Sequence, residues 1–300
     1  MPAGSGQPWR PRMAHRAALG LVFNAFTWGV SWWPFRQLQD FGLHPLWVTA
    51  LAYSAIVLVL AVRRPRAIAE LVRTPSLWVL VAAAGTTNAT FNWAVTTGDV
   101  VRVVLLFYLM PLWAVLLARG LLGERLTPLG AACVTLALAG ASVVLWPASG
   151  GWPWPRDLPD MLALLGGFSF ALNNVMLRRE AHRSNDARAM AMFGGGALVS
   201  GLLACGLAAA SPAAVSAAQW AWPVGPAMAG LALWFLASNL SLQYGAARLA
   251  AHTTAIVMLT EVLFASGSAV ALGAAQLGMQ VLLGGSLIVA AALLAALRTD

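Results

Sequence analysis

The chain has 300 residues, of which 60% are hydrophobic and only 9% are charged. Water-soluble domains carry about a quarter charged residues, so this composition excludes an ordinary soluble protein and favours a membrane protein. The net charge of +8 comes from arginines in short segments between apolar stretches, which argues against a nucleic-acid-binding face.

Apolar stretches of about 18–22 residues recur along the chain, and each is long enough to cross a hydrocarbon core of roughly 30 Å. They are predicted to be helices, because lipid cannot satisfy free backbone groups. In chain order the ten stretches are Ala17–Phe35, Pro45–Val62, Ser76–Val95, Val101–Leu122, Leu129–Trp146, Leu158–Leu177, Ala189–Ala209, Val224–Tyr244, Thr253–Gly273 and Leu277–Leu297. The predicted fold class is an all-α membrane protein with ten transmembrane helices.

The segments outside these stretches predict the domain organisation. Residues 1–15 are expected to be a disordered cytoplasmic tail, and the stretch that follows has no clear small-residue cleavage site, so it is a retained span. Residues 148–158 are rich in proline, glycine and tryptophan, which favours a periplasmic linker. This linker separates a first five-helix repeat, residues 16–147, from a second, residues 159–300.

The basic residues, 18 in all, are arginines without exception, so a P-loop lysine and a Schiff-base lysine are both excluded. If Met1 lies in the cytoplasm, every arginine except Arg36, Arg102 and Arg156 falls on the cytoplasmic side. This positive-inside pattern predicts that both termini are cytoplasmic. An odd number of spans per half inverts the second half, and inverted repeats are a recurring design of secondary transporters.

A family resemblance rests on Phe107–Gly130, "FYLMPLWAVLLARGLLGERLTPLG". This segment resembles the proline-containing helix and Gly-Glu-x-Leu-Thr loop of the EamA-type drug/metabolite transporter superfamily. The loop residues are Gly123, Glu124, Leu126 and Thr127. The second half departs from the pattern, since Leu272–Gln280 lacks the glutamate and Glu261 stands where the repeat would place a proline matching Pro111.

Within that superfamily the chain is most similar to the aromatic amino acid exporter branch. The residues that carry this similarity are Trp28, Tyr108–Pro111, Gly166–Asn174 and Asn239. The resemblance implies export of amino acids, aromatic or hydrophobic ones above all, across a bacterial inner membrane by alternating access between the two repeats. Export of another small metabolite or drug-like solute, or a channel-like facilitator, remains an alternative.

Polar groups inside membrane spans are costly unless they face a partner or water, so their positions indicate where a cavity lies. Amides can bind both the carboxylate and the ammonium of an amino acid, and aromatic rings supply an apolar wall. The alternative is that each polar side chain bonds a neighbouring helix. The candidate substrate-binding residues are Asn24, Trp28, Ser31, Asn88, Asn92, Tyr108, Phe170, Asn173, Trp234, Ser238, Asn239 and Glu261.

Three roles are open for Glu261, a carboxylate deep in an apolar stretch: carrying a proton, contacting the substrate, or bonding a backbone group. Arg102 and Asp99 lie near the predicted outer mouth. They form either a solvated loop pair or a gate that admits the substrate carboxylate.

Enzymatic activity is not expected. The chain contains no His-Glu-x-x-His motif and no visible Gly-x-Ser-Gly serine with a partner histidine at depth, and aspartyl chemistry would need a second buried acid beside Glu261. We expect no cofactor, no metal ion and no nucleic-acid partner. The expected partners are a small-molecule substrate, the lipid bilayer and, in one of the roles of Glu261, protons, and the expected state is a monomer.

Overall fold

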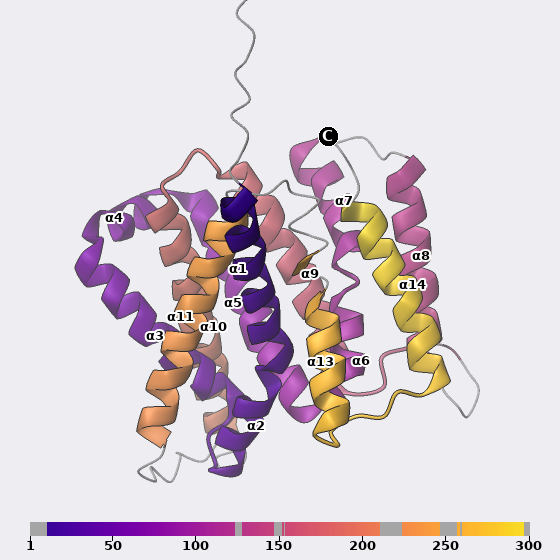
Figure 1. The fold of residues 1–300 in the computed structure, drawn as a ribbon. Coiled ribbons are helices and arrows are strands. Elements are labelled where there is room, and N and C mark those ends of the chain that lie inside the picture. Colours follow the sequence, from indigo (N-terminus) through magenta and orange to yellow (C-terminus); the bar gives the residue numbers. More distant parts are fainter. Residues whose placement is uncertain are drawn as a thin grey trace, which may run out of the picture.

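The computed structural model describes residues 11–123, 128–146, 152, 154–210, 224–246, 257–258 and 260–296, and every regular element in these ranges is an α-helix (Figure 1). The helices are α1 (Pro11–Val30), α2 (Trp32–Asp40), α3 (Pro45–Arg63), α4 (Pro65–Arg73), α5 (Pro75–Thr97), α6 (Val100–Phe107), α7 (Met110–Leu122), α8 (Pro128–Leu145), α9 (Leu158–Arg179), α10 (Asn185–Ala210), α11 (Val224–Ala246), α13 (Thr260–Ala271) and α14 (Met279–Ala296). The prediction of an all-helical protein is confirmed for this part of the chain.

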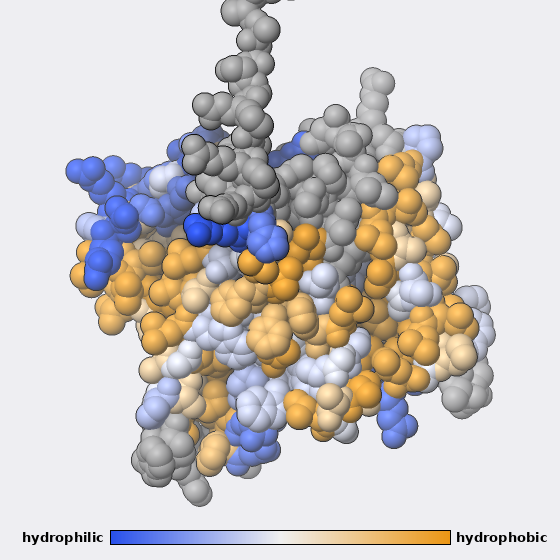
Figure 2. Space-filling view, viewed as in Figure 1, coloured by the Kyte–Doolittle hydropathy of each residue, from blue (hydrophilic) through white to orange (hydrophobic). Residues whose placement is uncertain are grey.

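Six stretches of helix within the described ranges are long and apolar enough to cross a membrane. They are α3, α6 together with α7, α8, α9, α10 and α11, and the bent pair α4–α5 supplies a seventh candidate. Apolar side chains form a broad band over the flank of the molecule (Figure 2). These features agree with a multi-pass membrane protein, and the count of ten spans stays a prediction.

The first predicted span, Ala17–Phe35, is not one continuous helix. α1 ends at Val30 and α2 begins at Trp32, and the hydroxyl of Ser31 donates to the carbonyl of Trp28 at 2.9 Å. Pro34 has no backbone N–H, so it cannot bond the carbonyl of Val30 four residues earlier. The proline therefore breaks the helix, and the expectation of a single helix is wrong here.

The fourth predicted span, Val101–Leu122, is also broken. α6 ends at Phe107 and α7 begins at Met110, because Pro111 cannot donate a hydrogen bond to the carbonyl of Phe107. That freed carbonyl lies against α9, where a Cβ on Gly167 would come within 2.5 Å of it. Glycine at this position lets α9 approach the break closely.

The amphipathic helix α4 is a feature that the span prediction missed. It meets α5 at an angle of 105°. Arg66 and Arg73 are exposed beside Ile68 and Val72, which lie one turn apart and are also exposed. An amphipathic helix at a large angle to the spans is typical of the membrane–water interface. Figure 2 shows hydrophilic residues gathered over this end of the molecule, next to the apolar band.

Helices from the two halves pack against each other throughout the molecule. α8 packs on α14, α3 on α10, α6 on α13, α5 on both α9 and α10, and α1 on both α11 and α13. Glycines form the closest of these contacts: a Cβ on Gly140 would lie 2.7 Å from the carbonyl oxygen of Gly284, and Gly85 lies directly against Gly195. Small residues allow such close helix approach in lipid.

The molecule has two distinct polar ends. At one end, α4 contacts the connection between α9 and α10, since Glu70 accepts hydrogen bonds from the backbone N–H and the hydroxyl of Ser184. Arg64 also lies 3.6 Å from Asp186 there. At the other end, Arg36 contacts the carboxyl end of α5. This grouping fits the predicted arginine asymmetry, and the assignment of each end to a side of the membrane stays a prediction.

Some predicted boundaries fall on residues outside the described ranges. α1 begins at Pro11, inside the predicted tail, and residues 1–10 lie outside those ranges. Residues 147–151 and 153 of the linker region and residues 124–127 of the family-like loop also lie outside them. Gly123, which precedes that loop, ends α7 with a left-handed backbone (φ 71°) that suits glycine.

Candidate functional site

Five aromatic rings form a continuous row of contacts between the two halves. Trp28 of α1 stacks on Phe235 of α11, with ring centroids 5.1 Å apart and planes 12° from parallel. The other side of the row continues from Trp28 to Phe91 of α5 (6.4 Å), then to Phe107 of α6 (4.7 Å) and Phe170 of α9 (5.4 Å). We call these residues the central aromatic cluster. It brings together Trp28 and Phe170, two of the predicted site residues.

A buried polar pair lies one turn from the stacked rings. Asn24 precedes Trp28 by one turn of α1, and Ser238 follows Phe235 by nearly one turn of α11. The amide nitrogen of Asn24 donates to the Ser238 hydroxyl at 2.7 Å and to its carbonyl at 3.0 Å, and neither residue is exposed. The structure therefore brings a third and a fourth predicted site residue together across the two halves.

Three buried amide oxygens have no hydrogen-bond partner among the described residues: Oδ1 of Asn24, of Asn92 and of Asn173. The nitrogens of these amides are occupied, since Asn92 donates to the Thr49 hydroxyl at 2.9 Å and Asn173 donates to Asn174 at 3.4 Å. Buried polar atoms are nearly always paired, so each unpaired oxygen needs an explanation. An ammonium group is one donor from which such oxygens can accept a hydrogen bond.

The remaining polar residues bond inside the helical framework. Asn88 accepts a 2.6 Å hydrogen bond from the Tyr53 hydroxyl and donates to the backbone one turn earlier. Asn239 donates to the carbonyl of Phe235, and Ser31 donates to that of Trp28. These three candidates therefore form hydrogen bonds to neighbouring protein groups. This agrees with the alternative interpretation, in which each polar side chain bonds a neighbour and does not contact a substrate.

Tyr108 and Glu261 form a second buried polar pair between the halves. The Tyr108 hydroxyl lies 3.0 Å from Oε2 of Glu261 and 3.2 Å from the carbonyl oxygen of Met258. Tyr108 lies in the break between α6 and α7, and Glu261 lies in the first turn of α13. The ring of Tyr108 is 6.2 Å from that of Phe107, so this pair adjoins the central aromatic cluster.

Trp234 is not part of the central aromatic cluster. Its ring contacts Phe26, a residue that is 41% exposed. Together with Trp33 and Phe41 it lines an apolar groove of about 360 Å³ between α2 and α11. Trp33 and Phe41 are largely exposed, so this groove opens on the outer surface of the molecule rather than at the central aromatic cluster.

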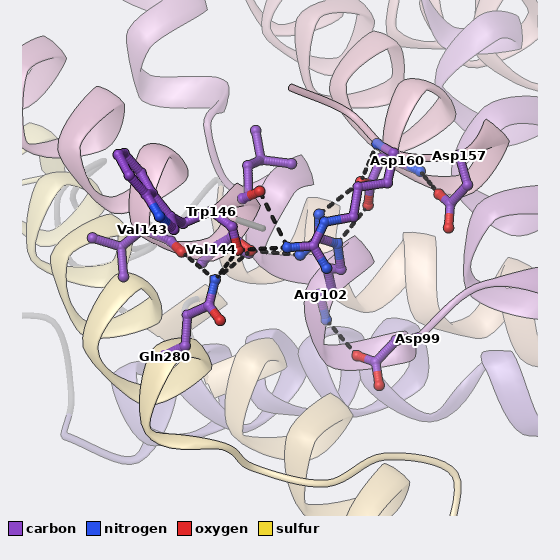
Figure 3. Close-up of polar contacts among 10 residues, drawn as sticks. Asp99, Arg102, Val143, Val144, Trp146, Asp157, Asp160 and Gln280 are labelled. Atoms are coloured by element: carbon purple, nitrogen blue, oxygen red, sulfur yellow. Dashed lines mark hydrogen bonds and ion pairs between the residues drawn. The ribbon is translucent and has the colours of Figure 1, made fainter. Parts of the chain in front are cut away.

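Arg102 pairs with a residue that the sequence did not single out. Its guanidinium binds both carboxylate oxygens of Asp160 at 2.7 Å, and it also donates to the carbonyl of Val144 at the end of α8 (Figure 3). Asp99 instead accepts from the backbone N–H of Arg102 at 2.8 Å and so caps the start of α6. Gln280 of α14 donates to the same carboxyl end of α8.

Each of the three arginines described at this end binds a helix carboxyl terminus. Arg36 donates to the carbonyls of Val95, Thr96 and Gly98 at the end of α5. Arg156 donates to the carbonyls of Leu145 and Trp146 at the end of α8. Cations are favourable at the negative end of a helix dipole, so these positions have a structural reason. Burial lowers the pKa of Arg36, and the nearby charge of Asp99 opposes that shift.

The first half of the chain is similar in sequence to known transporters. Residues 15–146 match the EamA-like transporter family. A protein of Pseudomonas aeruginosa described as an uncharacterized transporter is 34% identical over 148 residues, which is 47% of this chain and 48% of that protein. The chain thus matches about half the length of this relative. A solved crystal structure that covers 93% of this chain and 95% of its own has a TM-score of 0.55 at 18% identity, which shows a shared fold.

The EamA-like match spans α1 to α8, and the fold similarity extends over both halves. This match supports the family resemblance inferred from the sequence over residues 15–146. The aromatic amino acid exporter branch and the individual site residues stay predictions.

Several residues of the site were missed from the sequence. Asp160 lies near the start of the predicted span Leu158–Leu177 and is 1% exposed, so an acidic residue inside an apolar stretch was the available signal. Phe91, Phe107 and Phe235 had no such signal, because phenylalanine is common in membrane spans and one sequence does not show which phenylalanines meet. Among the described residues, no group of three or more potential metal ligands lies close together.

Proposed function

We propose that the whole chain is a transporter of the EamA-like family that exports amino acids, aromatic or hydrophobic ones above all, from a bacterial cytoplasm. The observation that carries this proposal is the central aromatic cluster. Trp28, Phe91 and Phe107 come from the first half, Phe170 and Phe235 come from the second, and buried amides lie next to them. A site made by both halves is the arrangement that alternating access uses.

The helix pairing supports an inverted repeat. α3 and α10 are second in their halves, α6 and α13 fourth, and α8 and α14 fifth, and each pair is in contact. The contact between α5 and α9 also has its equivalent in that between α11 and α1. α1 leads away from the α4 end, whereas α9 leads toward it (Figure 1). These relations are those of two five-helix repeats related by a two-fold axis in the membrane plane.

The chemistry of the site fits an amino acid with an apolar side chain. Trp28 is only partly buried, and its ring, stacked on that of the buried Phe235, supplies an apolar surface on which another ring can pack. The unpaired amide oxygens of Asn24 and Asn173 are acceptors for an ammonium group. Another small amphipathic solute would use the same groups, and a channel-like facilitator would use the same path without a saturable site.

Counterflow in proteoliposomes tests this function. We expect labelled L-phenylalanine or L-tryptophan to exchange with saturation, and Trp28→Ala to raise the half-saturating concentration about tenfold, since an aromatic contact contributes roughly 0.5–1.5 kcal/mol beyond its buried area. Trp33→Ala is the matched control, because Trp33 is 48% exposed on the outer groove. Equal effects of both substitutions would show that the cluster is not the site, and unsaturable flux would favour a channel.

The proposed topology places both termini and α4 in the cytoplasm. A cysteine replacing the exposed Ala69 should then react only with a reagent added inside, and one replacing Trp152, which is 83% exposed, only with a reagent added outside. The opposite labelling pattern would reject the orientation. We further propose that the working unit is a monomer, because the central aromatic cluster is complete within one chain.

A further inference from the structure

Glu261 is a carboxyl group held almost entirely inside the helical bundle. It is 7% exposed and lies in the first turn of α13, between α1 and α6. A buried carboxyl that only bonded a neighbour could be replaced by a neutral amide without the cost of burying a charge. Ionisable groups inside membrane spans are therefore candidates for proton or ion pathways.

The hydroxyl of Tyr108 has one proton and two acceptors. One acceptor is Oε2 of Glu261 at 3.0 Å and the other is the carbonyl oxygen of Met258 at 3.2 Å. When the carboxyl group is ionised, it accepts the tyrosine proton. When it is protonated, it donates to the tyrosine oxygen, and the tyrosine proton turns to the Met258 carbonyl. The pair thus has a fully bonded arrangement in each protonation state.

The pair links the break in the fourth helix of the first half to the first turn of α13 in the second half. Tyr108 occupies the break between α6 and α7, and α6 is packed on α13, its equivalent in the second half. A change in the Tyr108–Glu261 bond therefore acts on the contact between α6 and α13, directly beside the break between α6 and α7. Broken helices near the membrane midplane are where transporters bind their coupling ions.

The pair is also in contact with the proposed substrate site. Gly29, the residue after Trp28, packs so closely on α13 that a Cβ there would lie 2.8 Å from the carbonyl of Glu261. Phe107 of the central aromatic cluster directly precedes Tyr108. A displacement of α13 at Glu261 would therefore shift α1 at Trp28.

No other described titratable group approaches this carboxyl. On α1, the ionisable residues are Arg12, His15 and Arg16, which precede Gly29 by at least 13 residues and so lie about 20 Å away along the helix. On α6, Arg102 lies six residues before Tyr108, about 9 Å along the axis, and is bound to Asp160. Among described groups, Tyr108 is thus the titratable neighbour of Glu261.

We propose that Glu261 is a proton-binding site and that the Tyr108–Glu261 pair couples inward proton movement to outward movement of the substrate. This inference rests on the proposed carrier function. With the site open to the outside, Glu261 takes a proton from water. With the site open to the cytoplasm, the O–H bond of the carboxyl group breaks and the proton passes to water on that side. Tyr108 then donates to the carboxylate, and the substrate binds for the return step.

Infrared titration of the protein in lipid nanodiscs tests the proton site without any substrate. We expect the C=O stretch of a protonated carboxyl group to disappear as the pH rises, to be absent in Glu261→Gln and to be shifted in frequency in Tyr108→Phe. Glu70→Gln is the matched control, because Glu70 lies on α4 and bonds Ser184 rather than Tyr108. A titrating band that Glu261→Gln and Tyr108→Phe both leave unchanged would overturn the assignment.

Proteoliposomes with an acidic interior test the coupling. In the wild type we expect the gradient to drive accumulation of labelled L-phenylalanine, measured as the ratio of uptake with the gradient to uptake without it. Glu261→Gln should reduce this ratio to one. Wild-type counterflow that ignores the gradient, or a ratio unchanged in Glu261→Gln, would overturn the coupling. Absence of counterflow for every amino acid would instead reject the proposed carrier function, and the infrared titration would still decide whether Glu261 binds a proton.

Discussion

The ion pair between Arg102 and Asp160 is buried, and its burial determines how much stability the protein should lose when one partner is removed. The carboxylate of Asp160 is 2% exposed and the side chain of Arg102 is 17% exposed, with both guanidinium contacts at 2.7 Å. Removing one partner of a buried pair costs roughly 3–5 kcal/mol, because the other charge remains without its partner. Asp160 keeps one bond, from the backbone N–H of Arg156 at 2.9 Å. We therefore expect Arg102→Met to destabilise the protein by about 3 kcal/mol, the low end of that range.

The chain contains its own control for this substitution. Arg64 pairs with Asp186 at 3.6 Å, but the two side chains are 63% and 49% exposed, so Arg64→Met should cost less than about 1 kcal/mol. Denaturation of the purified protein in mixed micelles, followed by circular dichroism, measures both changes. A double-mutant cycle with Asp160→Asn should give a coupling free energy of at least about 2 kcal/mol. Equal losses for the two arginines, or an additive cycle, would refute the argument from burial.

Two further predictions concern helix packing and pH. Gly195→Val should destabilise the protein by about 2 kcal/mol or more, because a Cβ there would overlap the carbonyl of Val81 on α5. Gly194 has open space around it, so Gly194→Val should change the stability little in the same denaturation assay. Hydrogen bonds from Ser184 hold the pKa of Glu70 below its ordinary value of 4.5, so this stabilisation is complete above that value and is lost as the pH falls through the lowered pKa. Thermal unfolding below about pH 5 should thus depend on pH less in Glu70→Gln than in the wild type. The difference should be small, because the contact between Glu70 and Ser184 is exposed to solvent.

The membrane spans could be predicted from the sequence because lipid imposes a length and a composition on each of them. Most predicted ranges agree with a helix to within a few residues, as for Pro45–Val62 and α3. The breaks inside two spans were not predicted, although Pro34 and Pro111 were visible. Prolines are tolerated within membrane helices when neighbouring groups satisfy the freed carbonyl, so a proline alone does not tell whether a helix bends or breaks.

The site could be predicted only in part, for a different physical reason. Asn24, Ser238, Tyr108 and Glu261 were identified because polar atoms are rare in apolar spans, and the structure joins them in two pairs. A single sequence gives the position of such groups but not their partners. Trp234 shows the limit, since a tryptophan in an apolar helix suits a lipid-facing groove as well as a central cavity.

The polar interactions at the two ends of the molecule differ in strength. This difference affects which end the proposed carrier would open more easily. At the α4 end the contacts between Arg64 and Asp186 and between Glu70 and Ser184 are exposed, so each contributes little. At the other end the buried pair of Arg102 and Asp160 joins the two halves. If the proposed carrier opens at this second end, that buried pair must separate, at a larger cost than the loss of the exposed contacts at the α4 end.

The Arg102→Met variant therefore has a second expected effect, which distinguishes a gate from a purely stabilising contact. If the pair holds this end shut, its loss should expose residues that are now buried behind it on α6. Leu105 is 3% exposed and packs against Gly285 of α14. A cysteine at this position should react faster with a membrane-impermeant thiol reagent added from that side when Arg102 is methionine. Faster labelling in folded protein would follow from a shifted conformational equilibrium, because a loss of global stability alone would expose both ends alike.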